Sequence, residues 1–174
     1  MKLIQTIHAY DVSMFYWVMQ RKSQKLLVRC ARFVSHSADG HLYLALAGFL
    51  AWSRTYPNQQ LLACMALALL IERPLYFIIK NCCRRDRPPA ALNIQSFIVP
   101  SDKFSFPSGH TSAAFLMASL ISCFIPALSP VLFVWASMVG MARVILGVHF
   151  PTDTLVGALM GSAAALISME TLLL

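Results

Sequence analysis

Charged side chains are scarce in this sequence. Asp, Glu, Lys and Arg make up 12% of its 174 residues, while 58% of the residues are hydrophobic. A soluble domain has about 25% charged and about 45–50% apolar residues. The scarcity of charge and the long apolar runs therefore exclude an ordinary soluble domain. They predict an all-α fold, a polytopic membrane helix bundle.

Acidic residues are the rarest of the charged types, with seven against fourteen basic residues and a net charge of +7. No nucleic-acid motif accompanies the positive charge, so we expect it to meet an anionic lipid bilayer. Asp86, Asp102 and Asp153 are dispersed, which argues against a carboxylate cage for Mg²⁺. The five cysteines are an odd number without metal-site spacing, so neither a disulfide framework nor a zinc site is expected. The sequence predicts no metal and no other cofactor.

Apolar stretches along the chain predict about five transmembrane helices. They cover residues 41–52, 61–79, 108–125, 130–148 and 154–174. The first is short, and an additional span between Ile4 and Met19 would raise the number to six. Glu72 lies inside the second span, and we expect it to pair with a neighbouring helix. Gly157 and Gly161 form a Gly-x-x-x-Gly pair in the fifth, which would permit close helix packing.

The first 37 residues have a different character, because they combine aromatic rings with a basic run. The rings are Tyr10, Phe15, Tyr16 and Trp17, and the cations are Arg21, Lys22, Lys25, Arg29 and Arg32. This mixture favours a helix lying in the membrane interface, and a solvated basic arm is the alternative. We therefore predict an interfacial arm over residues 1–37 and a membrane-embedded domain over residues 38–174. The arm has no sustained apolar core and is not expected to be a signal peptide.

A polar loop ends and an apolar run begins within residues 104–112, Phe-Ser-Phe-Pro-Ser-Gly-His-Thr-Ser. Ser108 falls where a helix N-cap is expected. The unpaired N–H groups and the positive dipole end of such a helix suit an anion such as phosphate. Gly109 would let the backbone approach that anion closely, and His110 can donate a proton near neutral pH. Taken alone, the segment is equally an ordinary helix start.

Because consecutive spans alternate in direction, several polar positions fall on one face of the membrane. Their side chains are those of Lys80, Arg87, Ser108, His110, Arg143, His149 and Asp153. Cations bind phosphate oxygens, and two histidines can supply a nucleophile and an acid. A carboxylate four residues after His149 can hold one ring nitrogen and leave the other free for attack. The set provides the positioning and the charge that phosphoryl transfer needs.

Three motifs in this order resemble the signatures of the type 2 phosphatidic acid phosphatase superfamily. They are Lys80-x6-Arg87-Pro88, Pro107-Ser108-Gly109-His110 and Arg143-x5-His149-x3-Asp153. The resemblance implies that His149 is the nucleophile, that Asp153 orients it, and that His110 is the general acid. It also implies that the phosphoryl group is bound by Lys80, Arg87, Ser108, Gly109 and Arg143.

Two features depart from that pattern. The third motif usually begins Ser-Arg, but Ala142 precedes Arg143 here. We expect this change to reduce phosphate affinity or to alter headgroup preference without abolishing the reaction. Arg84 and Arg85 do not match the first motif, and we expect them to face lipid headgroups or to serve as positive flanks.

By resemblance, the chain is a membrane hydrolase of a lipid phosphomonoester or diphosphate that works through a phosphohistidine. The superfamily includes phosphatidylglycerophosphatases and undecaprenyl pyrophosphatases. Candidate substrates are therefore phosphatidic acid, phosphatidylglycerol phosphate and polyprenyl pyrophosphate. Two alternatives stay open. One is a lipid phosphotransferase that uses the same intermediate. The other is a non-catalytic lipid-binding protein, which the retained histidines and aspartate argue against.

Two arguments about the face of the membrane conflict. Basic residues gather in the arm and in the loop 80–106, on the catalytic side, whereas the opposite side has only Arg54. The positive-inside rule would make the catalytic face cytoplasmic. The resemblance to bacterial members that recycle polyprenyl carriers points to the periplasm instead. We favour a periplasmic site in a bacterial inner membrane.

Overall fold

The structure is a computed structural model that describes residues 2–20, 24–100 and 102–173. Its helices are α1 (Lys2–Met19), α2 (Gln24–His36), α3 (Gly40–Ser53), α4 (Tyr56–Cys83), α5 (Pro88–Leu92), α6 (Gly109–Phe124), η1 (Pro126–Leu128), α7 (Ser129–Ile145) and α8 (Pro151–Leu173). The described residues form no strand, so the expected all-α class is confirmed. Arg21 and Lys22, two cations of the predicted arm, lie outside the described residues.

Three helical segments are long and apolar enough to cross a membrane: α4, α8 and Pro126–Ile145, which joins η1 to α7. α6 is apolar but has only 16 residues, because it starts after the loop that ends at Ser108 and stops just before Pro126. α3 has 14 residues, and its length of about 21 Å falls short of the ~30 Å hydrocarbon core. The chain is an integral membrane protein. The number of five or six spans stays a prediction.

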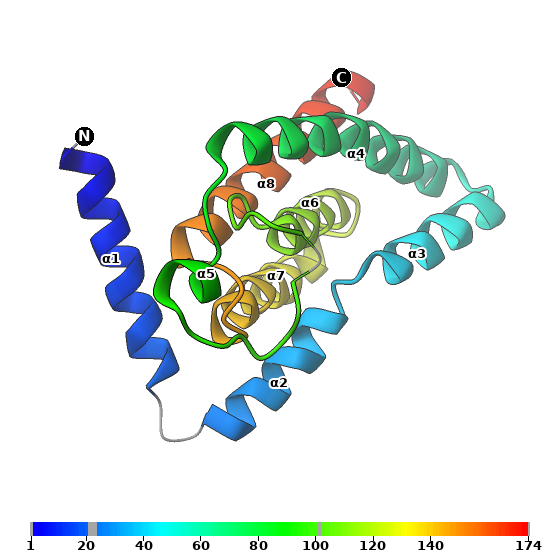
Figure 1. The fold of residues 1–174 in the computed structure, drawn as a ribbon. Helices are drawn as coiled ribbons and strands as arrows, with labels where there is room; N and C mark the ends of the chain where they lie inside the picture. The colour runs from blue at the N-terminus through cyan, green and yellow to red at the C-terminus, as the bar shows by residue number, and fades with distance from the viewer. Residues whose placement is uncertain (1, 21–23, 101, 174) are drawn as a thin grey trace.

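The backbones of α6 and α8 are in close contact at the centre of the bundle (Figure 1). A Cβ atom added at Gly157 would lie 2.5 Å from the carbonyl oxygen of Ser108, and one at Gly161 would lie 2.0 Å from that of Ser112. Both distances are shorter than van der Waals contact, so only glycine fits. The packing predicted from the Gly-x-x-x-Gly pair is confirmed. It places the start of α6 beside the first turns of α8.

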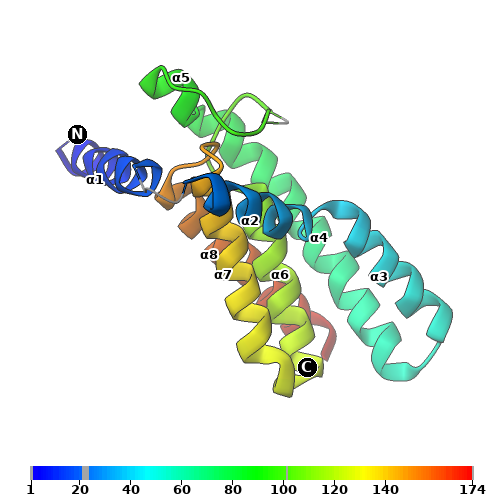
Figure 2. The same cartoon turned by 90° about the horizontal axis from the view of Figure 1, so that it is seen from below.

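α1 and α2 lie across one end of the bundle, and α5 with its following loop lies at the same end (Figures 1 and 2). Val28 and Ala31 of α2 pack in a cluster with Leu146, just after α7. In α1, the ring of Phe15 packs against that of Phe150, with the centroids 5.8 Å apart. Both helices therefore bury one side against the bundle, as an interfacial arm would. The boundary between arm and domain stays a prediction.

Glu72 is fully buried in α4, and its charge is compensated inside the protein. Arg73 forms an ion pair with it, and the hydroxyl of Ser112 in α6 donates a hydrogen bond to it. A buried carboxylate without such partners would cost several kcal/mol, on the order of the effective desolvation penalty of one ion. Glu72 thus joins α4 to α6, as expected from the sequence.

Candidate active site

Lys80 and Arg87 converge on one carboxylate, that of Asp102. Lys80 ends the buried face of α4, and its Nζ lies 2.8 Å from Oδ2 of Asp102. Arg87, the N-cap residue of α5, pairs with Oδ1 and also donates from Nε to the Asp102 carbonyl, at 3.0 Å. Burial alone would raise the pKa of Asp102, but the hydrogen bonds from both cations outweigh it and lower the pKa to about 2. The two predicted phosphate-binding cations are thus held together by an anion from the loop.

Tyr76 links these cations to the start of α6. Lys80 donates a hydrogen bond to the Tyr76 hydroxyl, which donates in turn to Asp102 at 2.9 Å. A Cβ atom at Gly109 would lie 3.1 Å from the Tyr76 ring. Glycine at position 109 therefore lets the tyrosine, and the lysine behind it, lie directly against the backbone at the helix start.

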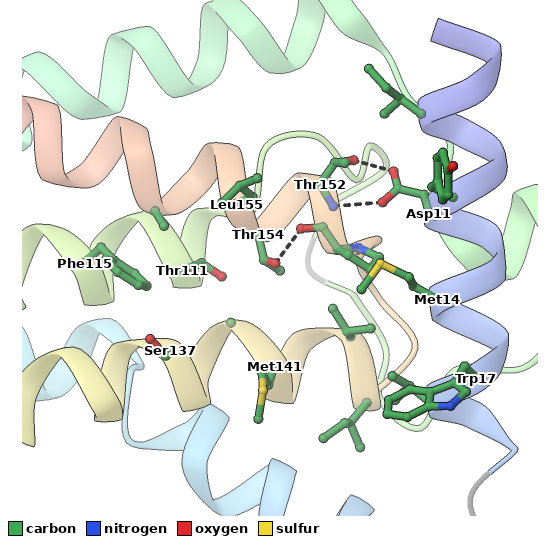
Figure 3. A pocket seen from close by; sticks show the side chains of 18 of the residues that line it. Asp11, Met14, Trp17, Thr111, Phe115, Ser137, Met141, Thr152, Thr154 and Leu155 are labelled. Carbon is green, nitrogen blue, oxygen red and sulfur yellow. Dashed lines mark hydrogen bonds between the residues drawn. The ribbon is translucent and has the colours of Figure 1, made fainter. Parts of the chain in front are cut away.

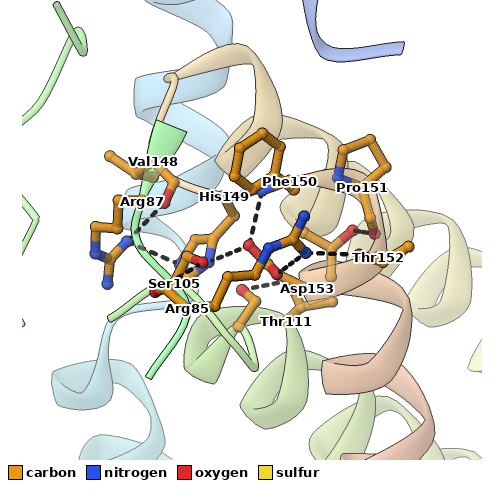
Figure 4. A network of polar contacts seen from close by, with 12 residues as sticks. Arg85, Arg87, Ser105, Thr111, Val148, His149, Phe150, Pro151, Thr152 and Asp153 are labelled. Carbon is orange, nitrogen blue, oxygen red and sulfur yellow. Dashed lines mark hydrogen bonds and ion pairs between the residues drawn. The ribbon is translucent and has the colours of Figure 1, made fainter. Parts of the chain in front are cut away.

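His149, between α7 and α8, and Asp153, in the first turn of α8, are both buried (Figure 4). Nδ1 of His149 lies 3.6 Å from Oδ2 of Asp153, longer than a hydrogen bond. That oxygen accepts the Phe150 backbone N–H at 2.8 Å. Nδ1 has no hydrogen-bond partner in the described parts of the chain. The pair is thus aligned but loose, as catalytic hydrogen bonds often are before substrate binds.

The other ring nitrogen of His149 points to the phosphate-binding cations. Nε2 lies 3.3 Å from Nη1 of Arg87, which donates to the Val148 carbonyl at 2.7 Å. Burial lowers the pKa of His149 to about 4; Arg87 and Arg143 add to this effect, and Asp153 offsets only part of it. The imidazole is therefore neutral near pH 7, which is the form that can attack phosphorus.

Ser108 occupies the expected N-cap position of α6, with an extended backbone. Its hydroxyl bonds to Thr111 Oγ1 at 2.9 Å rather than to a backbone N–H. Its own N–H donates to the Asp153 carbonyl at 2.9 Å. The second and third motifs are therefore joined through the backbone, and the open end of α6 is fixed beside the His149–Asp153 pair.

His110 is held by Asp39, the N-cap residue of α3. Nε2 of His110 lies 3.1 Å from Oδ1 of Asp39, and Oδ2 of Asp39 is hydrogen-bonded to Nδ1 of His36. Burial would raise the pKa of Asp39, but the bonds to the two histidines outweigh burial and lower it. His110, Asp39 and Arg143 line one pocket of about 380 Å³. Asp39 was not among the candidate residues, because no local pattern links it to His110, 71 residues away.

Arg143 is buried in α7, and its Nη1 donates to the hydroxyl of Ser35 in α2 at 2.9 Å. Its Nε is buried and has no partner among the described residues, which leaves one donor unpaired in a residue that lines the pocket. Ala142, by contrast, packs among apolar side chains, including Val28 and Leu146. A hydroxyl therefore reaches Arg143 from α2, although the serine usual at position 142 is missing.

The expectation that Arg85 faces lipid headgroups is wrong. Its guanidinium points inward and forms ion pairs with Asp153 and with Asp11 of α1, each at 2.7 Å. Arg84 is exposed, and its side chain donates to the Asn81 carbonyl at 2.9 Å. The pattern of the chain gave no signal for Arg85, because its partners lie 68 and 74 residues away.

An apolar groove of about 800 Å³ lies between α1 and the helices α6, α7 and α8 (Figure 3). Met14 and Trp17 of α1 line one wall, and Phe115 and Met141 line the wall across from it. Asp11 and Thr152 lie at one end of the groove, where Thr152 contacts α1. The groove therefore runs along apolar side chains of the bundle and ends beside Thr152, next to the His149–Asp153 pair.

Comparisons with known proteins decide the family. A profile of the PAP2 superfamily matches residues 59–173. The chain belongs to this superfamily. Among similar PAP2 proteins, decaprenylphosphoryl-5-phosphoribose phosphatase of Mycobacterium tuberculosis is 33% identical over 151 residues, covering 81% of this chain and 78% of that protein. Phosphatidylglycerophosphatase B of Bacillus subtilis is 35% identical over 108 residues, covering 56% of this chain and 51% of that protein.

The fold is also that of a solved relative. The crystal structure of Aquifex aeolicus LpxE is similar with a TM-score of 0.80 and 28% identity, covering 91% of this chain and 94% of that one. PAP2 membership confirms the resemblance drawn from the three motifs. It makes the chain a hydrolase of lipid phosphates. The individual substrate and the roles of the site residues are proposals.

Proposed function

We propose that this PAP2 protein hydrolyses a lipid phosphomonoester or pyrophosphate through a phosphohistidine on His149. The observation that supports this most strongly is the position of its Nε2, 3.3 Å from the guanidinium of Arg87. A neutral imidazole nitrogen beside a buried cation is arranged to meet the phosphorus of a bound anion. Phosphatidic acid, phosphatidylglycerol phosphate and polyprenyl pyrophosphate are the candidate substrates.

In the first step the phosphoryl group displaces Asp102 and lies among Lys80, Arg87 and Arg143. Nε2 of His149 attacks phosphorus, and the bond to the leaving oxygen breaks. His110 gives its proton to that oxygen, so the lipid alcohol or lipid phosphate departs. The cations, with the N–H groups at the start of α6, stabilise the charge on the transferring oxygens.

In the second step water attacks the phosphohistidine. His110, now neutral, takes a proton from this water, the N–P bond breaks, and inorganic phosphate leaves. Asp153 stabilises the imidazolium that exists between the two steps. Three cations supply the positive charge that a Mg²⁺ ion gives in other phosphoryl-transfer enzymes, so the proposal needs no metal.

The apolar groove supports a lipid substrate over a small soluble ester. Its walls bear Met14, Trp17 and Phe115. The end that contains Asp11 reaches Thr152, next to Asp153. A hydrocarbon chain in this groove would leave water, at a gain of about 0.8 kcal/mol per buried methylene. Long-chain substrates should therefore be turned over with a lower KM than short-chain analogues of the same headgroup.

The test is release of inorganic phosphate by the purified protein in detergent, with the three candidate lipids as substrates. His149→Ala should abolish turnover, whereas His41→Ala, at an exposed histidine, should leave it unchanged. Vanadate should inhibit, because its trigonal-bipyramidal adduct mimics the transferring phosphoryl group, and EDTA should not. Near-normal activity of His149→Ala would overturn the phosphohistidine mechanism.

A further inference from the structure

A buried charge cluster lies directly behind the His149–Asp153 pair. Asp11 of α1 is 2% exposed and Asp153 is fully buried. Arg85 bridges them: Nη2 donates to Oδ2 of Asp11, and Nη1 donates to Oδ1 of Asp153, each at 2.7 Å. The Arg85 guanidinium also packs 4.2 Å from the centroid of the Phe150 ring. Figure 4 shows Arg85 reaching across to Asp153 and Thr152.

Asp11 also forms hydrogen bonds to Thr152, in the segment that follows His149. Its Oδ1 accepts the backbone N–H of Thr152 at 3.0 Å, and its Oδ2 accepts the Thr152 hydroxyl (Figure 3). Arg85 donates to the same hydroxyl at 2.8 Å. Thr152 lies between His149 and Asp153 in the chain. One side chain of α1 therefore fixes the segment 149–153 through both its backbone and its hydroxyl.

The charges of the cluster are unbalanced in the resting protein. Two buried carboxylates share one guanidinium, and buried ions are tolerated only when they are compensated. In a phosphohistidine that keeps the proton on Nδ1 the imidazole ring carries a charge of +1, while the negative phosphoryl group faces Lys80, Arg87 and Arg143. The ring charge would bring the sum for Asp11, Arg85, Asp153 and the His149 ring to zero. Without the charge of Asp11, Arg85 would neutralise Asp153 alone. Less negative potential would then remain to stabilise the intermediate.

We propose that Asp11 is a positioning residue for the reaction, acting through Arg85 and Thr152 on the His149–Asp153 pair. This inference rests on the phosphohistidine mechanism proposed above. It makes α1 a part of the catalytic apparatus, although α1 precedes the residues 59–173 that match the superfamily. α1 then has a role in the reaction besides the lipid contact predicted for the arm.

The decisive variant is Asp11→Asn, which keeps the size of the side chain and removes its charge. We expect kcat on a long-chain phosphatidic acid in detergent micelles to fall about 10-fold, the low end of what is lost when the partner behind a metal-ligating histidine is removed. Inhibition by inorganic phosphate should stay unchanged, because Lys80, Arg87 and Arg143 are untouched. Asp86→Asn, which removes an exposed carboxylate, is the matched control and should behave as the wild type.

Arg85→Lys tests the bridge, because a lysine cannot donate along both arms of the guanidinium fork. Arg84→Lys is its control at the neighbouring exposed arginine. If Asp11 acts through Arg85, the variant with both Asp11→Asn and Arg85→Lys should be as active as the less active of the two single variants. Independent effects would multiply instead. Thr152→Val, which removes only a hydroxyl, serves if Asp11→Asn does not fold, and it should also lower kcat.

The proposal is overturned if Asp11→Asn, or Thr152→Val in its place, keeps the wild-type kcat. It is overturned too if kcat and phosphate affinity fall together, since that pattern reports general damage to the site. Failure of the proposed function would look different. In that case the wild type would release no phosphate from any lipid tested, or His149→Ala would remain active.

Discussion

Asp102 lies between Lys80 and Arg87, where a substrate would place its phosphoryl oxygens. The carboxylate pairs with both buried cations in the resting site, and in the proposed mechanism the incoming anion displaces it. Asp102→Asn replaces a charged competitor by a neutral amide. We expect inorganic phosphate to inhibit this variant several-fold more strongly, corresponding to about 1 kcal/mol. Weaker inhibition would mean that Asp102 chiefly holds the cations in place for substrate.

His149 gives the folded protein a specific sensitivity to acid. Its ordinary pKa of 6.5 is lowered to about 4 by burial. Between these values the unfolded chain binds a proton that the folded chain does not, so the free energy of unfolding falls as pH decreases through this window. Thermal unfolding in detergent should show a larger loss of Tm from about pH 7 to about pH 4.5 in the wild type than in His149→Gln. Asp102 titrates below this range and does not confound the comparison. Equal losses in the two proteins would contradict the buried, neutral state of His149.

The sequence identified the residues of the three motifs, because the chemistry of phosphate recognition restricts their types and spacing. It did not identify Asp39, Asp102 or the inward role of Arg85. Each of these side chains meets its partner only after distant segments pack together, and Asp39 meets His110 across 71 residues. Charge compensation in a buried site depends on contacts between segments distant in the sequence, so no local sequence pattern predicts it.

At the scale of helices, the joint between α6 and α8 positions the site. Gly161→Ala would push a Cβ atom against the Ser112 carbonyl, 2.0 Å away, and the backbone cannot yield as a side chain does. We expect a loss of stability of about 1–3 kcal/mol, typical of overpacking, and a fall in activity, because the Ser108–Asp153 backbone hydrogen bond would be displaced. Thermal unfolding and phosphate release measure the two effects. Gly48→Ala in α3, where an added Cβ would meet nothing within 4 Å, is the control and should change neither. A fully active and stable Gly161→Ala variant would contradict this role of the joint.

The apolar runs predicted α6, α7 and α8 with ends within three residues of those observed, whereas α4 starts five residues before the predicted span 61–79 and ends four after it. α6 was expected over residues 108–125 and is found at Gly109–Phe124. The run 41–52 forms α3, which is too short to cross the hydrocarbon core. The aromatic and basic residues before it form α1 and α2, which lie across one end of the bundle. Hydropathy reports which residues avoid water, but it does not report the direction in which a short helix runs.

At the scale of the whole molecule, the face of the membrane is still a prediction, and we favour the periplasm. Val99 is 94% exposed in the loop between α5 and α6, at the end of the bundle that carries the candidate site. A cysteine placed there in a cysteine-free background should be labelled in intact cells by a membrane-impermeant reagent. A cysteine at Arg54, at the turn between α3 and α4, is the reciprocal control and should be labelled only after lysis. The opposite pattern would support the charge rule and a cytoplasmic site.

The short α6 has a consequence for how this enzyme meets its substrate. Its 16 residues are about 24 Å long, less than the ~30 Å of a typical hydrocarbon layer. Because α4 and α8 are long enough to cross this layer, we expect the site at the N-terminus of α6 to lie below the level of the headgroups. At that depth we expect the polar site to bring water to the lipid phosphate, so that the lipid need not be lifted out of its leaflet. Bilayer thickness then becomes a control on turnover: in vesicles of increasing acyl-chain length, we expect the rate to decline as the mismatch grows.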